Sequence, residues 1–347
     1  MSQTPQTIRV GVVGLGMGRH HAEQYRRVPE CELVALCDTD ELRLKHVAEQ
    51  MSVTRTWTDP HELFSSGEID AVSIATPNTT HHPLTMAALE AGLDVLCEKP
   101  MAMNTTEAQQ MLDAAQSRGR KLAIHFNHRM AASIRYIARF AHKGELGDIY
   151  FARAVWHRRR GIPARPSFVH KATAGGGCLI DLGVHMLDQA LYVMGFPRVV
   201  GVTAKTYRKF DKKLVPDLEM DVEDFAVAMI RFATGAMLEM EISWASHHHH
   251  PEQIVLQVYG TEGGALRRTE DYKDLEVSVH RNEHDGLTSS RMVRPPRDMA
   301  SVQADFINAI REDREPLCNA EHGVRAMQIL DAIYESSRTG KEVRMDD

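Results

Sequence analysis

The segment GVVGLGMGRHH, residues 11–21, decides the fold expected for the first half of the chain. It continues an apolar run that begins at Ile8, and it leads into residues with helical spacing. Gly14 and Gly16 stand at the turn, and Gly18 opens the predicted helix. Bare backbone at such a turn can approach a pyrophosphate, whose charge the helix N-terminus stabilises. The segment therefore predicts the strand–turn–helix unit of a dinucleotide-binding fold.

The glycine spacing departs from the usual G-x-G-x-x-G pattern, because the third glycine comes one residue early and Arg19 takes its place. Glycine also serves tight strand-to-helix turns without any ligand, so that structural explanation stays open. Asp38 favours the binding explanation, since it ends the second predicted strand 24 residues after Gly14. A carboxylate near this offset hydrogen-bonds the adenosine ribose and repels a 2′-phosphate. We therefore expect NAD as the cofactor, with NADP still possible because Arg43 is nearby.

Short apolar runs alternate with amphipathic runs up to about His125, which predicts an N-terminal Rossmann domain with a doubly wound parallel sheet. Ligands of such sheets bind beyond the carboxyl ends of the strands. Two polar segments, TPNTTHH (76–82) and EKP (98–100), fall at such ends. The expected cofactor-binding residues are Gly14, Gly16, Met17, Gly18, Asp38, Thr76, Pro77, Asn78, His81, Glu98 and Lys99. Simple turn chemistry for residues 76–78 and an exposed surface lysine at Lys99 are the structural alternatives.

After Asn127 the pattern changes to strict alternation of apolar and polar residues. In AMLEMEISW (236–244), Leu238, Met240 and Ile242 share one face of a predicted strand. Similar runs predict a C-terminal α+β domain with a large, open and mainly antiparallel sheet. We expect domains at residues 1–127 and 128–347. The open sheet needs a partner for its second face, so a homodimer or homotetramer through this sheet is expected.

The segment AGGGCLIDLGVHMLDQALYVMG (174–195) interrupts the second half with a glycine run and an apolar helix. Asp181 and His185 are four residues apart, hence on one face of that helix. A carboxylate beside an imidazole fixes its tautomer and stabilises the imidazolium, as a general base requires. A buried structural histidine bonded to its neighbour is the alternative.

Composition and charge exclude several classes of protein. With 347 residues, a net charge of −6 and 43% hydrophobic residues, the chain is typical of a two-domain globular protein that binds a small molecule. We expect no nucleic-acid or membrane partner. Five scattered cysteines without a C-x-x-C pair fit reduced thiols and a cytoplasmic location. No metal site is expected, and the run of four histidines at 247–250 is interpreted as an exposed loop.

The glycine turn, TPNTTH, LDVLCEKP and GGGCLIDLGVH, in this order and spacing, resemble the Gfo/Idh/MocA oxidoreductases over almost the whole chain. The resemblance implies an NAD(P)-dependent dehydrogenase acting on CH–OH groups of sugars, sugar derivatives or cyclitols. It implies that Lys99 hydrogen-bonds the reacting hydroxyl, that His185 moves the proton and that Asp181 orients His185. A glycosidase acting through transient oxidation and a non-catalytic NAD-binding regulator are the alternative functions.

The resemblance also implies substrate contacts from the second domain. The segment AVWHRRRGIPARPSF (154–168) looks like one found in some sugar-derivative dehydrogenases of the family. An exposed basic loop for residues 158–160 and a core position for Trp156 are the alternatives. The expected substrate-binding residues are Lys99, Arg129, Trp156, His157, Arg158, Asp181 and His185.

Overall fold

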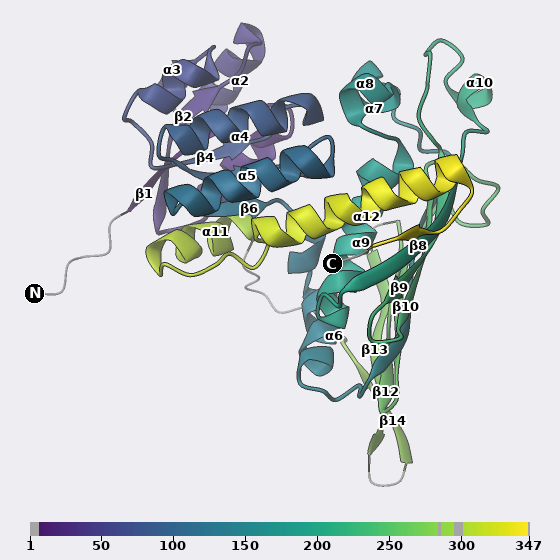
Figure 1. The fold of residues 1–347 in the computed structure, drawn as a ribbon. Helices are drawn as coiled ribbons and strands as arrows, with labels where there is room; N and C mark the ends of the chain where they lie inside the picture. Colours follow the sequence, from purple (N-terminus) through teal and green to yellow (C-terminus); the bar gives the residue numbers. More distant parts are fainter. Residues whose placement is uncertain (1–6, 272, 284–285, 295–300, 346–347) are drawn as a thin grey trace, which may run out of the picture. The chain divides into compact units, whose positions relative to one another are not determined.

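The computed structural model describes residues 7–271, 273–283, 286–294 and 301–345. Within these residues the chain divides into two units. The first unit comprises the described residues up to Asn127 together with 301–327, and the second unit comprises the remainder. Figure 1 shows the helices and strands of each unit.

Six parallel strands form the sheet of the first unit, in the order β3-β2-β1-β4-β5-β6. This strand order is that of dinucleotide-binding folds. The chain adds strands outward from β1 on one side and outward from β4 on the other, so the switch point lies between these two parallel neighbours. The ends of β1 and β4 therefore mark the position where such a sheet binds its ligand. The strands are β1 (Ile8–Val13), β2 (Cys31–Cys37), β3 (Arg55–Trp57), β4 (Ala71–Ile74), β5 (Asp94–Cys97) and β6 (Leu122–Ile124).

Helices connect these strands, and local capping residues define where several of them begin. The side chain of Asp40 accepts a hydrogen bond from the Arg43 backbone N–H (3.0 Å), and Asn104 caps its helix in the same way through Glu107. Figure 1 shows α4 and α5 side by side along the sheet. The helices are α1 (Gly18–Tyr25), α2 (Glu41–Met51), α3 (Pro60–Ser65), α4 (His81–Glu90), α5 (Thr105–Arg118) and α11 (Val302–Arg311), with 3-10 turns η1 (Asn78–Thr80) and η2 (Asn127–Met130).

A nine-stranded sheet dominates the second unit, in the order β14-β13-β12-β11-β7-β10-β9-β8-β15. Its strands pair antiparallel except for β10 with β7, which run parallel. The alternation read from the sequence is confirmed on β10, where Leu238, Met240 and Ile242 are buried. The strands are β7 (Ile149–Arg158), β8 (Val199–Tyr207), β9 (Phe225–Phe232), β10 (Met237–Ser243), β11 (Glu252–Gly260), β12 (Gly263–Glu270), β13 (Lys273–Glu283), β14 (Gly286–Arg291) and β15 (Val343–Arg344).

The helix α9 packs on β7, β10 and β11, and α6 packs on α9, β12 and β13. Every residue of α9 from Val184 to Leu191 is buried, because the helix is enclosed by the sheet and α6. The turn before it, η3 (Leu179–Gly183), is a π-helix and not the continuous α-helix expected from the sequence. The other helices are α6 (Ala132–His142), α7 (Pro166–Val169), α8 (Lys171–Ala174), α9 (Val184–Met194) and α10 (Asp211–Leu214).

The domain boundary expected from the sequence assigns all of residues 128–347 to the second unit. In the structure, residues 301–327 belong to the first unit instead. The Ile124 backbone N–H donates to the Cys318 carbonyl (2.8 Å), and residues 123 and 319 form a β-bridge, so the chain returns to the edge of the first sheet. The last helix, α12 (Ala320–Thr339), begins in the first unit and ends in the second. Pairing at a sheet edge is a tertiary feature that carries no local sequence signal. No helix of the described residues is long and apolar enough to cross a membrane.

Candidate active site

The three glycines of the turn in the first unit have different surroundings. Gly14 has φ +84°, and a Cβ on it would lie 2.7 Å from the Ala75 carbonyl oxygen, so a side chain is excluded there. A Cβ on Gly18 would lie 2.8 Å from Val12, which shows that Gly18 lets α1 pack closely on β1. Gly16 is exposed, and a Cβ on it would meet no atom within 4 Å. The shortened motif therefore keeps the tight turn and the close packing, and it leaves open space at Gly16.

The carboxylate of Asp38 holds this turn from the end of β2. It accepts hydrogen bonds from the backbone N–H groups of Leu15 (2.6 Å) and Asp40 (2.9 Å), and a bidentate pair from Arg43 (both 2.8 Å). Burial opposes ionisation, but these hydrogen bonds outweigh it and lower the pKa of Asp38. Asp38 is thus an anion that organises the turn, and Arg43 is its direct partner.

The residues after β4 form a short 3-10 turn that His81 ties to a second strand end. The Thr80 hydroxyl donates to the Thr76 hydroxyl (2.7 Å), Pro77 is exposed and Asn78 is half-buried. His81 is fully buried, with Nδ1 2.7 Å from the carbonyl oxygen of Pro100 and Nε2 2.9 Å from that of Thr76. Burial lowers the pKa of His81, and a neutral imidazole donates to one of the two carbonyls. His81 thus connects the loop after β4 with the loop after β5, at the carboxyl ends of these strands.

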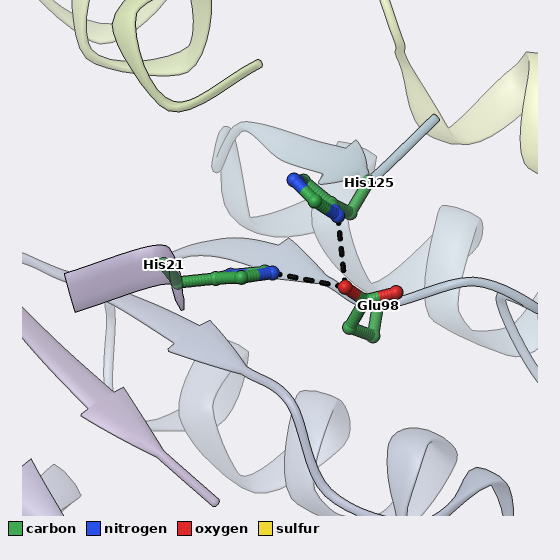
Figure 2. A group of neighbouring side chains, drawn as sticks. All are labelled: His21, Glu98 and His125. Carbon is green, nitrogen blue, oxygen red and sulfur yellow. Dashed lines mark hydrogen bonds and ion pairs between the residues drawn. The ribbon is translucent and has the colours of Figure 1, made fainter. Parts of the chain in front are cut away.

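The EKP segment follows β5 at this edge. Both carboxylate oxygens of Glu98 are engaged within the first unit, Oε1 by His21 and His125 and Oε2 by the backbone N–H of Lys99 (2.9 Å) (Figure 2). Glu98 is 8% exposed, whereas Lys99 is half-buried. The Lys99–Pro100 peptide bond is cis. Among the predicted cofactor residues, Met17 is 61% exposed at the start of α1.

In the second unit, Glu223 holds the glycine run and the start of η3. Its carboxylate accepts hydrogen bonds from the backbone N–H groups of Gly177 and Leu179 and from the Tyr334 hydroxyl, each at 3.0 Å. A Cβ on Gly177 would lie 1.9 Å from the Glu223 carbonyl oxygen, and one on Gly176 would lie 1.8 Å from the Tyr334 hydroxyl. The glycine run is therefore required by close approach within the unit.

Asp181 lies in η3 and His185 one turn later in α9. The buried indole of Trp244 donates from Nε1 to Asp181 Oδ2 (3.0 Å), which fixes the orientation of that carboxylate. The ring of His128 lies 4.5 Å from that of His185 between centroids. A single π-helical turn is a common device at functional sites, because it turns side chains away from the regular helical spacing.

The predicted substrate residues of β7 are more enclosed than expected. Trp156 is 2% exposed, and its indole donates to Glu252 Oε1 (2.9 Å), the oxygen that also accepts from Arg158 Nε (2.8 Å). The ring of Trp156 lies 5.2 Å from that of His128. His157 is buried, with Nε2 3.3 Å from a Glu241 oxygen. Trp156 is thus a buried residue that packs against the ring of His128.

Arg129 is fully buried in the second unit. Its guanidinium forms a bidentate ion pair with Asp188 on α9, with Nε 3.2 Å from Oδ2. It also lies over the rings of Tyr192 and Phe196, at 5.3 and 5.1 Å. These contacts favour a structural role for Arg129 over the expected substrate contact.

The run of four histidines at 247–250 is also held by a hydrogen bond, since Arg159 donates to the carbonyl oxygen of His248 (2.9 Å).

The sequence does not mark several residues of the site. They are His128, whose ring is tilted against that of His185, and the supporting groups His125, Glu223 and Tyr334. His21, interpretable from the sequence as a packing or phosphate neighbour of the glycine turn, contacts Glu98. His125 offered one signal, because it ends a strand next to β5 and so belongs to the ligand edge of the sheet. For Glu223 and Tyr334 the partners are 46 and 111 residues apart in sequence, and no local pattern connects them.

Two family models match the chain. One, described as an oxidoreductase family with an NAD-binding Rossmann fold, matches residues 8–126, and the other, the GFO/IDH/MocA C-terminal domain, matches residues 134–266. D-glucoside 3-dehydrogenase of Escherichia coli (strain K12) is 34% identical over 354 residues, covering 99% of both chains.

Solved structures agree with this assignment. GenD2 from gentamicin A biosynthesis, in complex with NAD, superposes with a TM-score of 0.82 and 30% identity, covering 100% of this chain and 98% of that one. Levoglucosan dehydrogenase in complex with NADH gives a TM-score of 0.88 and 25% identity, covering 99% and 100%. The fold class and the NAD-binding first unit are therefore as predicted. The chain belongs to the Gfo/Idh/MocA family of NAD-binding oxidoreductases.

Proposed function

We propose that the protein is an NAD-dependent dehydrogenase that oxidises a hydroxyl-bearing carbon of a sugar, a sugar derivative or a cyclitol. The observation that carries the proposal is a full-length relationship to a sugar dehydrogenase in a chain that contains Lys99, Asp181 and His185. The names of the relatives reported above give no support to the glycosidase or regulator alternatives. Since the relative with 34% identity is a D-glucoside 3-dehydrogenase, D-glucosides are the first substrates to test.

The proposed chemistry divides among three side chains. NAD, when bound, supplies the acceptor for the hydride that leaves the substrate carbon. The Lys99 ammonium donates a hydrogen bond to the reacting hydroxyl and stabilises the negative charge that develops on its oxygen. His185 takes the hydroxyl proton, and Asp181 stabilises the resulting imidazolium. The hydrogen bond from Trp244 to Asp181 supports this assignment, because it holds the carboxylate in one orientation.

The cofactor preference is proposed to be NAD over NADP. Support comes from the ionised carboxylate of Asp38 at the end of β2, whose charge disfavours a 2′-phosphate. Arg43 is paired with Asp38 and partly exposed, with 45% of its side chain accessible, so it is the residue that would accommodate a phosphate. Parallel assays with NAD and NADP test this preference directly.

The substrate contacts expected from the second unit are proposed more narrowly. His185 and Asp181 remain substrate-binding candidates, and His128 joins them because its ring contacts that of His185. The burial of Arg129 and Trp156 supports packing roles for these two residues. Arg158 keeps 23% of its side chain exposed beside Glu252 and remains a candidate.

We further propose that the protein forms a homodimer or homotetramer through the nine-stranded sheet. Exposed aromatic residues on three of its strands, Tyr150, Tyr207 and Tyr259, support this proposal, because large apolar rings are frequent at interfaces. Light scattering on the purified protein tests it. A cytoplasmic location is proposed from the five unpaired cysteines.

The test of the proposed mechanism is Lys99→Ala, compared with wild type and with Lys45→Ala on the exposed face of α2. We expect Lys99→Ala to lower kcat at least about 100-fold, the usual loss when one donor to a developing oxyanion is removed. NAD binding, measured by fluorescence titration, is expected to stay within about twofold, and Lys45→Ala to behave as wild type. Unchanged turnover in Lys99→Ala would contradict the role given to this lysine.

A further inference from the structure

Two histidines converge on one buried carboxylate in the first unit (Figure 2). His21 comes from α1, His125 follows β6, and Glu98 follows β5. His21 Nε2 lies 2.9 Å and His125 Nδ1 lies 2.8 Å from the same oxygen, Oε1 of Glu98. All three residues are less than 9% exposed. The proposed chemistry of Lys99, Asp181 and His185 does not use this cluster.

The carboxylate determines the direction of every hydrogen bond around it. An ionised Glu98 only accepts, so His21 Nε2 and His125 Nδ1 both carry the proton. The bare Nδ1 of a neutral His21 then accepts from the Ser73 hydroxyl (3.0 Å). Ser73 has used its one proton, so the Tyr25 hydroxyl donates to it (3.1 Å). The array is complete on this side with each group in a single role.

The other imidazole is held by the same logic. His125 Nε2 carries no proton, and it accepts from the side-chain amide of Gln303 on α11 (3.1 Å). Burial alone would raise the pKa of Glu98, but the two imidazoles lower it well below its usual range. Burial and the neighbouring His125 lower the pKa of His21 to about 4, so His21 is neutral near neutral pH. An ionised Glu98 carboxylate beside a neutral His21 therefore agrees with the hydrogen-bond geometry.

The same three side chains have the composition of a metal site, since their nearest ligand-type atoms lie within 4.8 Å of one another. A hydrogen-bonded cluster explains the arrangement of these three side chains better than a metal site does. The two nitrogen–oxygen distances are those of charge-assisted hydrogen bonds, and a metal would need both nitrogens to present lone pairs instead of protons. Ser73 and Gln303 would then also have to reverse their roles.

The array ends at Lys99. The second oxygen of Glu98, Oε2, accepts from the Lys99 backbone N–H (2.9 Å), and His81 contacts the carbonyl oxygen of Pro100 (2.7 Å). The backbone at Lys99 is thus contacted on both sides, at its N–H by Glu98 and at the following carbonyl by His81. A lysine side chain has four rotatable methylene groups, so its ammonium can be placed reproducibly only if the backbone that carries it is fixed.

We propose that His21, His125 and Glu98 are positioning residues, whose hydrogen-bonded array fixes the backbone at Lys99 and so places its ammonium for catalysis. This inference rests on the proposed role of Lys99. It assigns to Glu98 a task within the protein in place of the cofactor contact expected from the sequence.

The test compares His125→Asn with His125→Leu in the full-length protein. The Asn side-chain amide occupies the place of Nδ1 and can still donate to Glu98. Leu has a volume similar to that of Asn but has no hydrogen-bond donor. We expect His125→Leu to lower kcat by about 10- to 100-fold, the loss typical of supporting residues. We expect His125→Asn to restore most of it, with the NAD dissociation constant within about twofold in both. His46→Asn on the exposed face of α2 is the matched control and is expected to behave as wild type.

Hydrogen exchange at the Lys99 amide gives a second readout that does not depend on turnover. The amide is expected to exchange slowly in wild type and His125→Asn, and at least about tenfold faster in His125→Leu. Should His125→Leu fail to fold, Glu98→Gln replaces it, because its amide keeps the volume but sets an NH2 donor against either the Lys99 N–H or the two imidazole N–H groups. If wild type turns over no substrate, the proposed function fails, and the exchange result still decides the positioning role.

Two results would overturn the inference. One is a folded His125→Leu protein whose kcat and Lys99 exchange both match wild type. The other is stoichiometric zinc in the purified wild-type protein, measured by elemental analysis and lost in His125→Leu, which would make the cluster a metal site.

Discussion

Replacing Gly177 with alanine is expected to destabilise the second unit by about 3–5 kcal/mol. The new Cβ would lie 1.9 Å from the Glu223 carbonyl oxygen, and separations under 3.0 Å are essentially never seen. The two backbones must therefore part by about 1.1 Å, the difference between these values. That movement breaks the hydrogen bonds from Gly177 and Leu179 to the Glu223 carboxylate and from Cys178 to its carbonyl. Each is worth about 1–2 kcal/mol.

Chemical denaturation followed by tryptophan fluorescence measures this loss, because Trp156 and Trp244 both lie in the second unit. Gly235→Ala is the matched control, since Gly235 has φ +88° in open space and is expected to cost only about 1–2 kcal/mol. We also expect Gly177→Ala to lower kcat, because Asp181 stands on the displaced turn. A denaturation midpoint for Gly177→Ala at or above that of Gly235→Ala would refute the reasoning.

Three further predictions concern single side chains. Gly16→Ala is expected to leave stability within about 0.5 kcal/mol, because the methyl group meets open space, but to weaken NAD binding about tenfold in a fluorescence titration. Trp244→Phe removes the donor to Asp181 and is expected to lower kcat and to cost about 2 kcal/mol in a thermal melt, with NAD affinity unchanged. Arg129→Leu strips Asp188 of its buried guanidinium and is expected to cost about 3–5 kcal/mol of stability, while KM of the folded fraction stays near wild type.

The alternating pattern of the chain predicts most of the fold because burial follows the side-chain period. β2 and β10 are visible in the sequence for this reason, since their apolar residues meet a core. β3 and β14 are not, because RTW and GLTSSR are short or polar and lie at sheet edges, where backbone hydrogen bonds form most of the pairing. Their side chains carry no signal of that pairing.

The candidate site is predictable where one motif contains both the group and its reason. Gly14 needs its positive φ for the turn, and Asp38 stands at a fixed offset from it. The supports are not predictable, because Glu223 reaches the glycine run from a distant segment. Arg129 shows the converse, since an arginine after a strand end resembles a ligand contact until Asp188 is seen beside it.

The central claim is hydride transfer from a sugar or cyclitol carbon to NAD. The measurement that tests it most directly is the near-ultraviolet absorbance of reduced nicotinamide when wild-type protein and NAD meet alkyl D-glucosides, free aldoses, anhydrosugars and inositols. We predict a rise with one of these classes, together with one equivalent of the matching keto product. Absence of any change with all of them, and with keto-sugars and NADH in reverse, while NAD binds, would contradict the claim.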